Sequence, residues 1–86
     1  MSDTAREEDL RRIAVIVAEI TGLEEDEIRP DAELVDDLCI DSVARIELMV
    51  ACESRLGVAM PDEVVNRLRT VDDVLDHFAA ARTPAS

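Results

Sequence analysis

The sequence has almost no aromatic residues and few of the residues that tight turns require. Phe78 is the only aromatic side chain in 86 residues, and there are two glycines and three prolines. So few turn residues argue against a sheet of many strands, because each hairpin needs them. A small core without aromatic rings must be aliphatic, and the 48% hydrophobic content is enough to build one. These absences favour a small all-α domain.

Lysine is absent, and acidic residues greatly outnumber basic ones. The 21 Asp and Glu residues compare with nine arginines, so the formal net charge is −12. A surface of this charge repels nucleic acid phosphates and anionic membranes. We therefore expect no nucleic acid or membrane partner, and we expect partner proteins with basic docking patches.

Cysteine is also scarce. Cys39 and Cys52 are too few for a disulfide scaffold, and they lack the spacing of a zinc site. The acidic segment DEIRPDAELVDD lacks the central glycine of a calcium-binding EF-hand loop. No apolar run approaches the roughly 20 residues of a membrane-spanning helix, and the polar start MSDTAREED is unlike a secretory signal. We expect a cytoplasmic monomer without a bound metal.

Apolar residues at helical spacing predict a bundle of three main helices and one short helix. Thr4 and Glu7 have capping-box spacing at the start of the first helix, and Gly22 follows its end. The second helix is expected to begin at Asp41 or Ser42. The expected elements are helices at residues 4–21, 41–56, 61–68 and from 70 onward, in one domain of residues 1–86 with a core of about 4–81 and short tails at 1–3 and 82–86.

The connection between the first two main helices is long and acidic. Its sequence, LEEDEIRPDAELVDDLCID, contains Pro30, which interrupts any helix. We expect four apolar side chains to attach it to the core: Leu23, Ile28, Leu34 and Leu38. A connection this long in so small a domain requires a structural or functional reason.

Ser42 stands where this acidic connection becomes the second helix. Asp41 is a good N-cap residue, and if it caps the helix, the Ser42 hydroxyl is free and lies in the positive field of the helix end. A phosphate attached there would be favoured. The alternative, which this feature alone favours, is that Ser42 is itself the cap and has no further role. The only histidine, His77, is far away in sequence and is expected at the surface or at the core boundary. Without a nearby base, Ser42 is not predicted to be a catalytic nucleophile, so the chain is not predicted to be an enzyme.

The second helix is apolar on two faces. One face carries Leu48, Met49, Cys52 and Leu56 and is the expected core face. The other carries Val43, Ile46 and Val50, together with Glu47 and Ser54. This second face either packs against the third helix or forms an exposed docking surface. The helical wheel alone favours packing.

Three ordered segments, DAELVDDLCIDSV, IELMVACESRLGVAMPDE and TVDDVLDHF, together resemble the acyl carrier proteins of fatty acid and polyketide synthesis. The resemblance covers about residues 10–78. It implies that a phosphopantetheinyl transferase attaches 4′-phosphopantetheine from coenzyme A to Ser42 as a phosphodiester. It also implies that the thiol of this arm carries the acyl cargo between enzymes while the carrier itself catalyses nothing.

The resemblance also assigns the second apolar face to docking with the transferase and with ketosynthase-type enzymes. The expected partner-contact residues are Asp41, Val43, Ile46, Glu47, Val50 and Glu53. The chain departs from the family with Cys39 in place of a usual glycine, Val43 in place of a usual leucine, and Arg45 on a helix that is often more acidic. These departures favour a polyketide-type carrier. The alternatives are a peptidyl or aminoacyl carrier, whose Gly-Gly-His/Asp-Ser context is absent here, and an unmodified interaction module.

Overall fold

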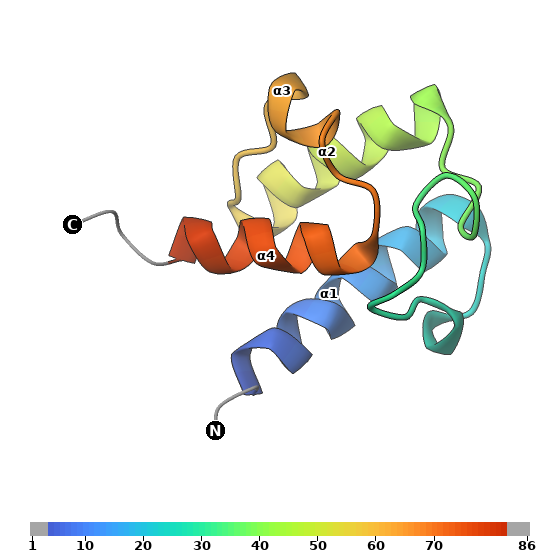
Figure 1. Ribbon diagram of the computed structural model, residues 1–86, viewed down its shortest axis with the longest axis horizontal. Helices are drawn as coiled ribbons and strands as arrows, with labels where there is room; N and C mark the ends of the chain where they lie inside the picture. Colours follow the sequence, from blue (N-terminus) through green and yellow to red (C-terminus); the bar gives the residue numbers. More distant parts are fainter. Residues whose placement is uncertain (1–3, 83–86) are drawn as a thin grey trace.

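The computed structural model describes residues 4–82, which form four α-helices and one short 3-10 helix (Figure 1). In chain order these are α1 (Thr4–Thr21), η1 (Glu25–Glu27), α2 (Ser42–Leu56), α3 (Asp62–Val65) and α4 (Val71–Arg82). The only strand-like feature in this part of the chain is an isolated bridge between Glu33 and Thr70. The predicted all-α fold, with three main helices and a short one, is confirmed.

The ends of the elements follow local sequence signals with small differences. Gly57 follows α2 with φ of +70°, a left-handed conformation that glycine adopts without strain. Arg82 ends α4, although it was predicted to lie in a tail. The expected tails at 1–3 and 83–86 and the expected cap by the Thr4 side chain fall outside what the structure describes.

The third helix is shorter than the sequence predicted. It ends at Val65, and Pro61 is its N-cap residue. The amides of Arg67 and Leu68 then donate to the carbonyls of the third residue before each, Val64 and Val65. Such bonds tighten the chain into turns and do not continue an α-helix. The prediction that this helix extends to about residue 68 was therefore wrong.

The core lies where α1 packs against both α2 and α4 (Figure 1). Its largest fully buried side chains are aliphatic, as the composition required, and they are Ile13, Ile16, Leu38, Leu48, Met60 and Leu75. Phe78 on α4 is buried with them. Full burial of one such side chain contributes about 1.5–3 kcal/mol.

The long acidic connection is fixed to the rest of the domain. Ile28, Leu34 and Leu38 are buried as predicted, and Leu23 is partly buried against them. Its backbone also pairs with the start of α4, because the Leu34 amide donates to the Arg69 carbonyl at 2.8 Å. Because the connection is held against the core, the position of Ser42 at the start of α2 is fixed relative to the rest of the domain.

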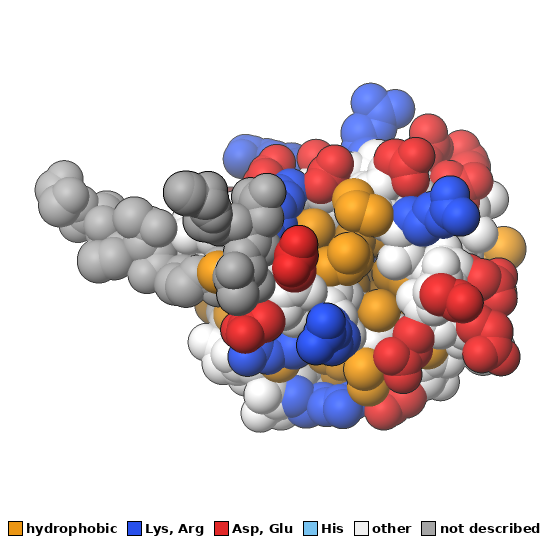
Figure 2. All heavy atoms as spheres, turned by 90° about the horizontal axis from the view of Figure 1, so that it is seen from below, with side chains coloured by type: hydrophobic (Ala, Val, Ile, Leu, Met, Phe, Trp, Pro, Cys, Tyr) orange, Lys and Arg blue, Asp and Glu red, His pale blue; other side chains and the backbone are white. Residues whose placement is uncertain are grey.

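Charge is unevenly distributed over the surface. Figure 2 shows acidic side chains gathered at the end of the molecule that carries this connection, with arginines interspersed. Within the acidic group, a hydrogen bond and the negative charge of Asp36 raise the pKa of Glu33. This carboxylate crowding opposes folding more strongly as the pH rises through the raised pKa of Glu33. No helix in the described part of the chain is long and apolar enough to cross a membrane.

Candidate functional site at the start of α2

Asp41 caps α2, and Ser42 is the first residue of the helix. The Asp41 side chain accepts the Ala44 amide at 2.8 Å, and the Asp41 carbonyl accepts the Arg45 amide at 2.9 Å. Of the two possibilities that the sequence left open, Asp41 is therefore the cap, and the interpretation that the helix start alone favoured, in which Ser42 caps the helix, is wrong. The Ser42 side chain is exposed and is not used for capping.

The start of α2 suits an attached anion. In the part of the chain that the structure describes, no partner accepts from the backbone amides of Ser42 and Val43. Two such amides at a helix N-terminus present a partial positive charge to a group on the adjacent hydroxyl. The residues present therefore fit a phosphodiester on Ser42 Oγ.

His77 does not serve Ser42 as a base. It is partly buried on α4, and its Nε2 lies 2.7 Å from the Ala59 carbonyl in the connection between α2 and α3. The expected boundary position is confirmed, and this ring nitrogen is occupied by a backbone contact. The structure offers Ser42 no nucleophile-activating partner among its described neighbours.

Cys39 occupies a left-handed backbone position three residues before Ser42. Its φ is +58°, and the side chain is exposed. This conformation reverses the chain after the turn at residues 33–38, so that the Ile40 amide reaches back to the Leu34 carbonyl at 2.9 Å and Ile40 enters the core. A glycine would adopt it freely, whereas another residue incurs about 1–2 kcal/mol of strain. The chain therefore keeps the backbone shape of a glycine position while using cysteine.

Replacing Cys39 with glycine is expected to stabilise the domain by about 0.5–1 kcal/mol. Relief of the left-handed strain, about 1–2 kcal/mol, exceeds the extra entropy that glycine gives the unfolded chain. Urea unfolding of the wild type, Cys39→Gly and Cys39→Ala measures the effect. Alanine retains a Cβ and serves as the control, because it should leave the midpoint close to that of the wild type. A midpoint for Cys39→Gly at or below that of Cys39→Ala contradicts the strain argument.

The second apolar face of α2 is exposed. Relative exposures are 66% for Val43, 59% for Ile46 and 58% for Val50, whereas Leu48 and Cys52 on the other face are buried. The interpretation in which this stripe packs against the third helix is therefore wrong. Glu47 lies on the same side and is exposed as well. A fourth exposed hydrophobic side chain, Val35 at 58%, lies in the connection and was missed from the sequence.

Two charged residues of α2, the predicted docking residue Glu53 and the basic residue Arg45, each make a hydrogen bond within the domain. Glu53 is exposed, but its carboxylate accepts the Met60 amide at 3.1 Å and so helps close the connection to α3. Arg45 donates from Nη1 to Asn66 Oδ1 at 3.1 Å and so links α2 with the end of α3. The predicted docking role of Glu53 must therefore coexist with a structural one.

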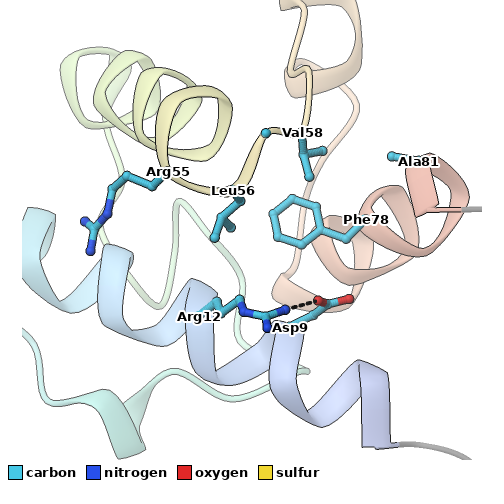
Figure 3. A pocket seen from close by; sticks show the side chains of 8 residues that line it. Asp9, Arg12, Arg55, Leu56, Val58, Phe78 and Ala81 are labelled. Atoms are coloured by element: carbon cyan, nitrogen blue, oxygen red, sulfur yellow. Dashed lines mark hydrogen bonds and ion pairs between the residues drawn. The ribbon is translucent and has the colours of Figure 1, made fainter.

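Recesses lie at both ends of α2. A recess of about 410 Å³ beside Ser42 is lined by Leu38, Cys39, Val43 and neighbouring residues. A cavity of about 490 Å³ lies at the other end, where the Phe78 ring lies beside Leu56 and Val58 (Figure 3). Since α2 has 15 residues, its ends are about 20 Å apart. The Figure 3 cavity is therefore separate from the candidate site.

An ion pair between a buried carboxylate and an exposed arginine borders the Figure 3 cavity. Asp9 is only 3% exposed, and its Oδ1 lies 3.4 Å from Nη1 of Arg12 on the next turn of α1. Burying a carboxylate is costly unless polar or charged groups contact it. Two of the polar residues that line the cavity, Asp9 and Arg12, therefore contact each other and contribute to the structure of the domain.

Comparison with known proteins gives one consistent family. Residues 11–78 match the family described as "Phosphopantetheine attachment site". The acyl carrier protein of Acidothermus cellulolyticus is 37% identical over 81 residues, which cover 94% of this chain and 96% of that protein. The meromycolate extension acyl carrier protein of Mycobacterium tuberculosis is 47% identical over 73 residues, covering 85% of this chain and 64% of that protein.

A solved structure agrees with these relatives. The acyl carrier protein from Enterococcus faecalis superposes with a TM-score of 0.72 at 28% identity, covering 88% of this chain and 96% of that one. The fold, the capped serine-bearing helix and the relatives all lead to the same assignment. The chain belongs to the acyl carrier protein family, whose domains are carriers that hold a covalently attached 4′-phosphopantetheine.

Proposed function

We propose that Ser42 is the residue to which 4′-phosphopantetheine is attached, and that α2 presents it to partner enzymes. The proposal rests on one observation, that the capping residue and the exposed serine at the start of α2 are two different residues. Asp41 caps α2 through the Ala44 amide, which leaves the Ser42 hydroxyl exposed and uncommitted. The two unpaired amides beside it favour the phosphate that attachment introduces.

The chemistry at Ser42 is a transfer carried out by another protein. Ser42 Oγ forms a bond to phosphorus, the pyrophosphate linkage of coenzyme A breaks, and its nucleotide part leaves. The serine proton passes to a base of the transferase, since His77 is held by the Ala59 carbonyl. Once attached, the arm supplies a terminal thiol that holds an acyl group as a thioester. This chain contributes the hydroxyl, the helix end and the surface on which enzymes dock.

The exposed stripe supports a docking role for α2. Single exposed hydrophobic residues are common, but Val43, Ile46 and Val50 form one continuous side of one helix. Glu47 borders this stripe, and basic patches on partner enzymes would complement it. The proposed partners are a phosphopantetheinyl transferase and acyl-transferring or ketosynthase-type enzymes.

Incubation with coenzyme A and a broad-specificity transferase tests the attachment. Intact-mass measurement is expected to show the addition of one phosphopantetheinyl group to the wild-type chain. An unchanged mass would leave the chain an unmodified interaction module and would refute the proposal.

For the pathway, we propose polyketide-type synthesis. The residues that support it are Cys39, Val43 and Arg45, which depart from the usual family pattern around Ser42. The similarity to a meromycolate extension carrier supports a second candidate, a role in fatty acid extension. Intact-mass analysis of the protein isolated from its native host distinguishes the two, because it weighs the arm together with its cargo. A saturated long-chain acyl group would favour fatty acid extension over the polyketide proposal.

A further inference from the structure

We propose that the Arg45 guanidinium binds the phosphodiester at Ser42. The inference rests on the proposed attachment at that serine. Arg45 lies three residues after Ser42 in α2, and side chains at this spacing are neighbours on a helix surface. In the structure the Arg45 guanidinium reaches Asn66, so binding a group on Ser42 requires the side chain to turn toward the start of α2, the direction in which helical side chains commonly lean.

Arg45 is a cation without an acidic partner in a strongly acidic protein. Among the residues described, Arg6, Arg12 and Arg55 each lie within 4.0 Å of a carboxylate oxygen. In the same part of the chain Arg45 does not, and neither do Arg11, Arg29, Arg67 and Arg69, but of these unpaired arginines only Arg45 lies on α2. Its hydrogen bond is to the neutral amide of Asn66. In a chain of net charge −12, this leaves a guanidinium available one helical turn from the serine.

The natural ion-pair partner of Arg45 is already committed. Asp41 precedes Arg45 by four residues, the spacing at which opposite charges pair on a helix. Its side chain instead turns to the helix end and accepts the Ala44 amide. The capping role of Asp41 therefore leaves Arg45 without this ion pair, and the guanidinium donates its hydrogen bond to the neutral Asn66 side chain.

A phosphodiester is a stronger partner for Arg45 than the Asn66 amide. The bond to Asn66 joins a cation to a neutral oxygen, whereas a phosphodiester would add the attraction of a full negative charge, and the planar guanidinium matches two phosphate oxygens at once. The arginine would also offset the negative charge that attachment adds beside Asp41 and Glu47. Binding the phosphate would draw Arg45 from Asn66, and attachment would thereby loosen the link between α2 and α3.

Comparison of the apo protein with the phosphopantetheinylated (holo) protein tests the inference in the wild type, Arg45→Gln and Arg45→Lys. In low salt, Arg45→Gln is expected to lower the holo midpoint of thermal unfolding, relative to its own apo midpoint, by about 2–5 °C more than in the wild type. The phosphorus NMR signal of the holo protein is expected to shift in Arg45→Gln. Arg45→Lys should show smaller changes in both measurements than Arg45→Gln, since lysine keeps the positive charge but lacks the planar guanidinium that donates two parallel hydrogen bonds.

Two control variants separate this role from simpler ones. Arg11→Gln removes the same charge from a surface position on α1 and should leave the phosphorus signal unchanged. Asn66→Ala removes the present hydrogen-bond partner of Arg45. The phosphorus NMR signal of its holo form should also match that of the holo wild type. Equal losses in the apo and holo forms of Arg45→Gln, with an unmoved phosphorus signal, would show that Arg45 only braces α2 against α3 and would overturn the inference. If the intact mass of the wild type shows no added arm, the proposed attachment itself is refuted. This result is distinct from a failure of the Arg45 inference.

Discussion

Ser42→Ala is expected to abolish phosphopantetheinylation completely while leaving the fold intact. The substitution removes the one oxygen that can form the phosphodiester at the start of α2. Ser42 is exposed and Asp41 supplies the cap, so the change should alter the free energy of unfolding by no more than about 0.5 kcal/mol. Intact mass after incubation with coenzyme A and the transferase measures the loss, and circular dichroism checks the fold.

Ser54→Ala is the matched control. Ser54 lies on the same helix and is exposed, but its hydroxyl donates to the Val50 carbonyl at 2.8 Å within the helix. This variant should gain the arm as the wild type does. Addition of the arm to Ser42→Ala, or its loss in Ser54→Ala, would place the attachment elsewhere.

The helices could be predicted because their signals are local, and the same signals limited the cap of α2 to Asp41 or Ser42 without choosing Asp41. Asp41 before an apolar helix, and Thr70 with Asp73 before α4, are short-range patterns of capping residues. Both caps are present, and at the second one the Thr70 amide donates to Asp73 while the Asp73 amide approaches the Thr70 hydroxyl. Such contacts depend on neighbours in sequence and little on the rest of the fold.

The exposure of the second face of α2 could not be derived from helical periodicity. A wheel shows that Val43, Ile46 and Val50 share a side, but whether α3 covers that side depends on where a four-residue helix packs. The burial of Ile40 and the left-handed backbone of Cys39 depend in the same way on the path of the connection. Family resemblance indicated the exposed face correctly because it includes knowledge of that packing.

Val50→Asp is expected to lower the kcat/KM of the transferase for this protein by about tenfold or more at both low and high salt. A carboxylate placed in an apolar contact must lose its water when the enzyme docks, and about 1.4 kcal/mol of lost binding corresponds to a factor of ten. Val50 is 58% exposed and outside the buried face of α2, so the helical content should be unchanged. Steady-state kinetics at two salt concentrations, with circular dichroism, measure both quantities.

Val35→Asp is the matched control for this substitution. Val35 has the same 58% exposure, but it lies in the connection and not on α2. It introduces the same carboxylate and the same change in net charge. A tenfold loss confined to Val50→Asp would localise docking to the helix, whereas equal losses would extend the docking surface to the connection. Wild-type kinetics for Val50→Asp would mean that this transferase docks elsewhere.

Glu47→Arg should act differently, because it changes long-range attraction and leaves the apolar contact in place. Glu47 is exposed beside the stripe, and a basic patch on the enzyme would be steered toward it during encounter. We expect a loss of a few-fold at low salt that nearly disappears at high salt, since ions shorten the reach of exposed charges to about 8 Å at physiological strength. Glu53 is unsuited to this test, because its carboxylate also holds the Met60 amide. Glu7→Arg on α1 controls for the change in net charge, and a loss there as large as for Glu47→Arg would show that overall charge, and not the α2 surface, governs the encounter.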